Sequence, residues 1–120
     1  MTSSSLQAAL RAGASGLYAL EAGTGLIIAH GYWPGRDDFA CFIDHGAETA
    51  AIDWEAAISA VNAGCLPCSG GERRMLRLAA SLAADIPVEL GDAVTGIDQR
   101  NADLLVESVL HASGRRSFPR

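Results

Sequence analysis

Lysine is absent from this 120-residue sequence: all nine basic side chains are arginines, and 14 residues are acidic. Without lysine, the chain can form no Schiff base and has no Walker A lysine to bind nucleotide phosphates. Its formal net charge is −5. Nucleic-acid binding depends on a basic face that neutralises phosphates, so this charge argues against a nucleic-acid partner.

Long apolar runs are also absent, and cysteines are few. The most apolar stretch, 17–29, is short and contains Glu21 and two glycines, whereas a membrane-spanning helix needs about 20 apolar residues. The N-terminal residues lack the basic start of a secretory signal. Three cysteines, an odd number, do not suit a secreted disulfide framework. We therefore expect a soluble, cytoplasmic protein in a reducing compartment, with no membrane partner.

The composition is that of a globular protein, with 49% hydrophobic and 19% charged residues. A chain of this length has the usual size of one domain and can bury a core without disulfide or metal support. We expect a single helical domain over 6–113. The segments 1–5 and 114–120 are expected to be flexible ends.

Glycines divide the chain into segments whose apolar residues recur at helical spacing. We expect helices over 4–12, 15–30, 53–64, 69–84 and 98–113. The clearest local signal is Ser69-x-x-Glu72, a capping box that begins the fourth of these helices. Asp53 and Asp98 are expected to cap the third and fifth.

In two segments the spacing of apolar residues does not distinguish a helix from a strand. An acidic first turn at 37–38 favours a helix over 39–46, but the apolar run 39–43 also suits a strand. Residues 88–95 alternate like a strand at their start and fit a short helix towards Gly96. The predicted fold is therefore an all-α bundle of five or six short helices. The alternative is an α+β fold with short strands near 39–43 and 88–90.

The three cysteines suggest one metal site. Cys65 and Cys68 have a two-ligand C-x-x-C spacing, and Cys41 and His45 lie one helical turn apart if their segment is helical. Together they would make a Cys3His set, which is typical of a tetrahedral zinc site. The alternatives are that Cys41 is a small core residue and the other two are reduced thiols, or that C-x-x-C is a redox pair.

Three aromatic residues surround a Pro-Gly turn: Tyr32, Trp33 and Phe39. Because aromatic side chains concentrate at the centres of protein interfaces, they are candidates for an exposed contact patch. The alternative is that they pack in the core beside the turn.

Residues 68–74 (CSGGERR) resemble the LSGGQ signature of ABC ATPases, and the likeness extends through position 98, with Asp92 about where the Walker B aspartate stands. The resemblance implies that Ser69 and Gly71 would contact a nucleotide γ-phosphate. The chain departs from the family because Ala93 replaces the catalytic glutamate. It also has no G-x4-G-K-[ST] loop, so it cannot hold a nucleotide by that mechanism.

Residues 52–114 resemble a group of small, uncharacterised helical proteins of high-GC Gram-positive bacteria. Their shared stretches are Asp-Trp-Glu-Ala-Ala, Leu-Pro-Cys-Ser, Arg-Leu-Ala-Ala-Ser-Leu-Ala and Thr-Gly-Ile-Asp-Gln-Arg-Asn. The resemblance implies a helical, cytoplasmic protein and no particular activity.

No spacing of Ser, His, Asp or Glu matches a known catalytic arrangement. We therefore predict a non-catalytic interaction or regulatory module that binds another protein or a second copy of itself. Three alternatives stay open: a zinc-stabilised module, a small enzyme using a carboxylate or histidine, and a DNA-binding helical regulator. The last would place Arg73, Arg74 and Arg77 on its recognition helix.

Overall fold

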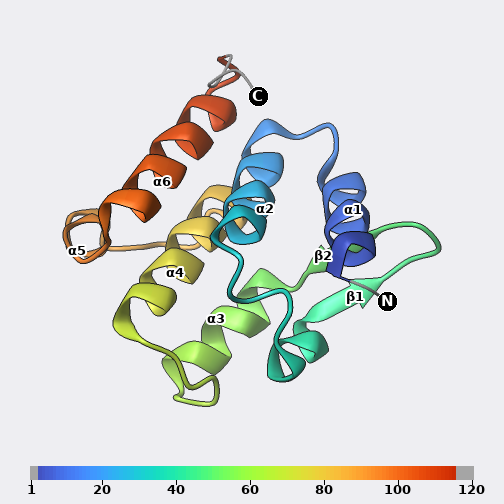
Figure 1. Ribbon diagram of the computed structural model, residues 1–120, viewed down its shortest axis with the longest axis horizontal. Helices are drawn as coiled ribbons and strands as arrows, with labels where there is room; N and C mark the ends of the chain where they lie inside the picture. Colours follow the sequence, from blue (N-terminus) through green and yellow to red (C-terminus); the bar gives the residue numbers. More distant parts are fainter. Residues whose placement is uncertain (1–2, 116–120) are drawn as a thin grey trace.

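The computed structural model describes residues 3–115, which form six α-helices, one 3-10 helix and a two-stranded antiparallel sheet (Figure 1). In chain order these are α1 (Ser3–Ala14), α2 (Tyr18–His30), η1 (Asp37–Phe42), β1 (Ile43–His45), β2 (Ala50–Ile52), α3 (Trp54–Asn62), α4 (Gly70–Ala84), α5 (Leu90–Thr95) and α6 (Gln99–Ala112). This mostly helical architecture confirms the predicted fold class, and the short strands belong to its alternative.

Side-chain caps begin three of the helices where the sequence predicts them. Asp53 accepts a hydrogen bond from the backbone N–H of Ala56 at the start of α3, and Asp98 caps α6 in the same way. At α4, the Ser69 hydroxyl accepts from the Glu72 N–H and the Glu72 carboxylate accepts from the Ser69 N–H, at 3.2 and 2.7 Å. Each cap satisfies N–H groups that the first turn leaves unpaired.

Helix α2 lies at the centre of the molecule, between α1 on one side and α6 on the other, and it packs on α4 (Figure 1). Gly31, with φ of +83°, ends it in the left-handed conformation that glycine readily adopts. Its start differs from the predicted range 15–30: the helix begins at Tyr18, and Leu17 stands at the N-cap position without a side-chain bond. The Glu21 carboxylate instead accepts from the Gly16 N–H, at 2.9 Å.

The segment 39–46 does not form the predicted α-helix. The chain forms the 3-10 helix η1 and then a hairpin, with Ile43 opposite Ile52 and His45 opposite Ala50. Both isoleucines are buried and the alternating Ala51 is exposed, so one face of the hairpin belongs to the core. A bond from the Asp53 N–H to the Phe42 carbonyl closes its open end. The strand therefore follows the apolar run 39–43 and does not coincide with it.

The structure also differs from the sequence prediction near residue 90 and at the N-terminus. Residues 90–95 form helix α5, so the strand considered near 88–90 is not formed. Residues 3–5, expected to be flexible, form the first turn of α1. The rest of the expected flexible N-terminus, 1–2, and positions 116–120 of the C-terminal tail lie outside the described residues.

The core joins the hairpin to the helices. Its largest fully buried side chains are Leu10, Leu26, Ile27, Trp33, Phe39, Met75 and Leu76. The radius of gyration, 13.4 Å, is close to the value of about 13.6 Å expected for a compact chain of this length. Of the helices in residues 3–115, none combines the length and apolar character needed to span a membrane.

Candidate functional site

The predicted metal site is not formed. Within residues 3–115, which include Cys41, His45, Cys65 and Cys68, no three His, Cys, Asp or Glu side chains are placed to hold a metal ion. Cys41 lies in η1 and His45 lies in β1. The two residues are therefore not one turn apart on a continuous helix, as the predicted site required. All three cysteines are free thiols.

The predicted contact patch is mostly core. Trp33 and Phe39 are fully buried, with ring centroids 5.5 Å apart, and the Trp33 indole N–H donates to the Glu72 carbonyl at 3.0 Å. Tyr32 is half-buried and packs edge-on against Trp33. The aromatic residues therefore hold the turn after α2 against the start of α4, and they offer no exposed patch.

Arg36 secures this turn. Its guanidinium donates to the Tyr32 hydroxyl and to the Pro67 carbonyl, each at 2.7 Å, and forms a two-point ion pair with Asp38. It also lies over the rings of Tyr32 and Trp33, about 5 Å from each centroid. One side chain thus joins the turn at 32–36 to the connector between α3 and α4.

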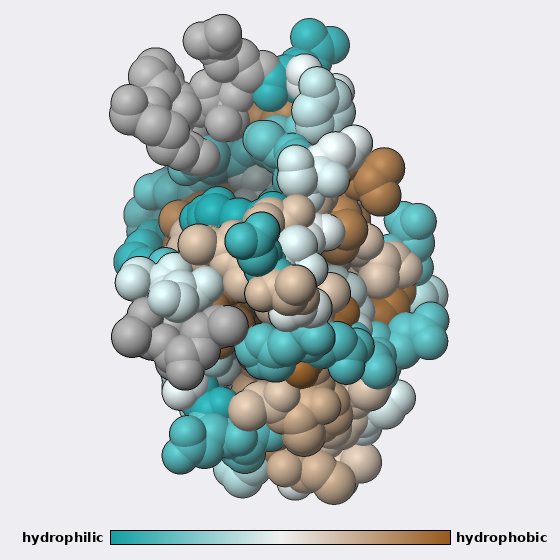
Figure 2. Space-filling view, turned by 90° about the vertical axis from the view of Figure 1, so that its right-hand side faces the viewer, coloured by the Kyte–Doolittle hydropathy of each residue, from teal (hydrophilic) through white to brown (hydrophobic). Residues whose placement is uncertain are grey.

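Apolar exposure is found elsewhere. Leu17 and Tyr18 at the start of α2, Leu90 on α5, and Val106 and Val109 on α6 are each about half exposed or more. On the side of the molecule that Figure 2 shows, which carries α1 and the hairpin, hydrophilic residues separate the apolar groups. Single apolar side chains exposed among polar ones are ordinary on a protein surface.

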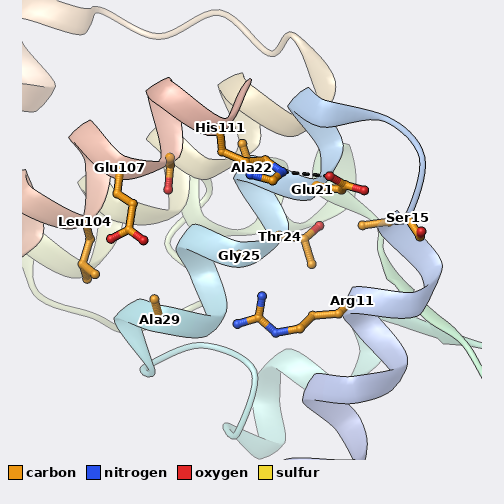
Figure 3. Close-up of a pocket in the computed structure, with 12 residues that line it drawn as sticks. Arg11, Ser15, Glu21, Ala22, Thr24, Gly25, Ala29, Leu104, Glu107 and His111 are labelled. Atoms are coloured by element: carbon orange, nitrogen blue, oxygen red, sulfur yellow. Dashed lines mark hydrogen bonds and ion pairs between the residues drawn. The ribbon is translucent and has the colours of Figure 1, made fainter. Parts of the chain in front are cut away.

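A groove of about 700 Å³ lies between α1, α2 and α6 (Figure 3). Helix α2 forms its floor, where Ala22, Gly25 and Ala29 follow one another at helical spacing. Because these residues have little or no side chain, they leave the space between α1 and α6 open above α2. We call this space the α2 groove.

A histidine and a carboxylate meet at one end of the α2 groove. His111 Nε2 lies 2.8 Å from Glu21 Oε1, joining the last turn of α6 to the first turn of α2. Tyr18 packs edge-on against the imidazole. The hydrogen bond from the Gly16 N–H, and then the one with His111, lower the pKa of Glu21. The carboxylate is therefore charged at neutral pH and orients the ring.

Further along, the floor and walls of the α2 groove carry polar groups. Thr24 and Ser108 are 4% and 9% exposed, and within residues 3–115 neither hydroxyl forms a hydrogen bond. Arg11 reaches in from α1 and Glu107 from α6 (Figure 3). Buried hydroxyl groups normally have partners, so these two are available to a bound molecule.

A second polar cluster lies where α2 ends near α4 and α6. The atoms His30 Nδ1, Arg74 Nε and Asn101 Oδ1 are buried, and in the described part of the chain they have no hydrogen-bond partner. Burial, and then the charge of Arg100, lower the pKa of His30, so the neutral ring is favoured here.

The residues named for the other predictions lie on separate elements. Ser69 caps α4, Gly71 lies in its first turn, and Asp92 lies in α5. Of the arginines considered for DNA recognition, Arg74 lies against Gly96 with its Nε buried. Arg77 donates to the Asn62 side chain at 2.5 Å. Of the three arginines on α4, Arg74 is therefore packed against its neighbours and Arg77 is held by a hydrogen bond.

Comparison of the chain with protein-family models, with curated proteins and with solved structures found no match. The candidate site therefore rests on geometry. The sequence carries one signal for it, the small residues Ala22, Gly25 and Ala29 on one face of a helix. It carries no local signal for the contact between Glu21 and His111, which are 90 positions apart.

Proposed function

We propose that the protein is a non-catalytic binding module whose ligand occupies the α2 groove. The observation that carries this proposal is a hollow of about 700 Å³, which is within the range of about 300–1,000 Å³ typical of small-molecule sites. It combines small apolar residues on its floor with polar and charged side chains that could orient a ligand.

The polar groups support binding over catalysis. Glu21 orients His111 as a carboxylate orients a catalytic histidine, but no serine, threonine or cysteine side chain in residues 3–115 is hydrogen-bonded to that ring. Nucleophilic catalysis requires such a contact between nucleophile and base. The pair instead closes one end of the groove by joining α2 to α6.

A substitution that fills the α2 groove tests the proposal. A Cβ at Gly25 would meet only the Arg11 guanidinium, at 3.8 Å, so Gly25→Leu places an isobutyl group in the groove and leaves the core intact. We expect fragments that bind the wild type, found by ¹H–¹⁵N NMR, to perturb amides of 21–29 and 104–111. Gly25→Leu should weaken them at least about tenfold, since it occupies their site.

Gly91→Leu is the matched control. Gly91 is also helical and has nothing within 4 Å of an added Cβ, so fragment affinity should stay within about twofold of wild type, a change of about 0.4 kcal/mol. Fragments that bind equally to Gly25→Leu, or that perturb only amides outside the groove, would contradict the proposal.

A small acid–base enzyme is the second candidate, because the 2.8 Å contact of Glu21 with His111 lies in the groove. In that case His111→Gln would abolish turnover of a test ester such as p-nitrophenyl acetate and leave fragment binding in place. If wild type and His111→Gln both hydrolyse the ester only at the rate of buffer, this candidate fails.

We further propose that the module works in the cytoplasm, which three free thiols support. A protein partner, either another protein or a second copy of this chain, stays a prediction from the sequence.

A further inference from the structure

Arg11 lines the α2 groove with an exposed guanidinium. It lies in the last turn of α1 and points towards α2 (Figure 3). Its Nη1 atom lies 3.8 Å from the position that a Cβ at Gly25 would take. The guanidinium therefore rests over the α2 backbone at the one place on the floor where no side chain stands in its way.

This guanidinium has no partner within the described chain. Arg36 and Arg77 bond to side chains and Arg100 donates to the Ala29 carbonyl, but Arg11 forms neither a hydrogen bond nor an ion pair in residues 3–115. A guanidinium presents its N–H groups as a planar fork that matches the two oxygens of a carboxylate. The hydroxyls of Thr24 and Ser108 line the same groove.

The rest of the α2 groove limits which anion fits. Glu21 and Glu107 also line it, so the second negative charge of a dianionic phosphate would add repulsion in the groove. A carboxylate carries a single charge, with which the Arg11 guanidinium can form a two-point pair. Ala22, Ala29 and Leu104 provide apolar contact for the body of such a molecule.

We propose that the α2 groove binds an amphiphilic monocarboxylate, whose carboxylate pairs with Arg11 and whose apolar body lies along Ala22, Ala29 and Leu104. This inference rests on the proposed function, since it needs the groove to be a binding site. It adds the chemical class of the ligand and names the residue that selects it.

The test compares octanoate with octanamide and octyl phosphate by NMR titration of the full chain. We expect octanoate to perturb amides of 21–29 and 104–108 and to bind about tenfold more tightly than the other two, since one charge-assisted pair contributes about 1.4 kcal/mol or more. Arg11→Gln should reduce octanoate binding to the level of octanamide. Arg73→Gln, the same charge change on α4, should leave octanoate binding unchanged.

Two results would overturn the inference and leave the groove as a binding site. One is equal binding of octanoate and octanamide that Gly25→Leu abolishes in both cases. The other is octyl phosphate binding more tightly than octanoate in a manner that depends on Arg11. Absence of octanoate binding also overturns it, and the fragment screen with Gly25→Leu then decides the proposed function by itself. Circular dichroism of Arg11→Gln confirms that the variant is folded.

Discussion

Gly23 and Gly25 lie two residues apart in α2 but serve different purposes. From the sequence, both are expected only to weaken the helix. In the structure, a Cβ at Gly23 would lie 2.5 Å from the Ala79 carbonyl oxygen and 2.6 Å from the Ala83 Cβ. Gly23 therefore allows α2 and α4 to approach closely, whereas Gly25 keeps the α2 groove open.

Alanine at these two positions should have opposite effects on stability. We expect Gly23→Ala to destabilise the fold by about 1–3 kcal/mol, because two backbones must separate. Gly25→Ala should stabilise it by up to about 1 kcal/mol, because alanine favours the helix. Urea unfolding measures both. Equal effects of the two substitutions would show that helix propensity, and not packing against α4, determines the outcome.

Arg36 is a second residue whose role depends on its contacts. Arg36→Gln removes the bonds to Tyr32, Asp38 and Pro67, and we expect a loss of about 1–3 kcal/mol, as for other hydrogen bonds to charged groups. Arg73→Gln on α4 is the control and should change the free energy of unfolding by less than about 0.5 kcal/mol. If the two variants unfold at the same urea concentration, the turn at 32–36 does not need its arginine.

The capping residues make separable contributions to α4 and α6. Ser69→Ala removes one side of the capping box and Asp98→Ala removes the cap of α6. Each should lower the free energy of unfolding by about 1 kcal/mol. Ser59→Ala, at an exposed position within α3, is the matched control and should be neutral or slightly stabilising. Chemical denaturation of the three variants tests this, and a loss in Ser59→Ala equal to that in Ser69→Ala would contradict it.

Local sequence signals predicted the elements that local chemistry determines. Helices with side-chain caps, such as α4 with its Ser69–Glu72 box, are found where expected. The hairpin was missed because its pairing of Ile43 with Ile52 is a contact between separate segments. Trp33 and Phe39 were predicted to form an exposed contact patch but are buried. The sequence around a turn is the same whether its aromatic side chains face the core or the solvent.

The functional groove was the least predictable feature for the same reason. Its floor, walls and closing pair come from three helices at opposite ends of the chain, α1, α2 and α6. Glu21 and His111 are too far apart in the sequence for any local pattern to include both. The fold class could therefore be predicted, and the site could not.

The molecule as a whole should lose stability in two stages as the pH falls. The pKa of His30 is lowered in the fold, mainly by burial and then by Arg100, against the opposing charges of Glu72 and Asp98. Below about pH 6.5 the unfolded chain thus takes up a proton that the native His30 resists, and stability falls. Glu21 and Glu72 have lowered pKa values because they accept backbone hydrogen bonds, so their contribution is lost below about pH 4.5.

His30→Gln separates the two stages. We expect this variant to lose the decline that begins near pH 6.5 and to keep the one below about pH 4.5. Urea unfolding at half-unit steps of pH gives the free energies needed. The same slope between pH 6.5 and 5 in wild type and variant would mean that another group is responsible.

The central place of α2 has a consequence for how the chain is made. Helix α2 ends at His30, but α6, which covers one of its sides, ends only at Ala112. A ribosome adds about 5–20 residues per second, so roughly 80 further residues take between about 4 and 16 seconds. Throughout that time the side of α2 that α6 covers lacks its final neighbour. The nascent chain should therefore be a substrate for chaperones until α6 has been made.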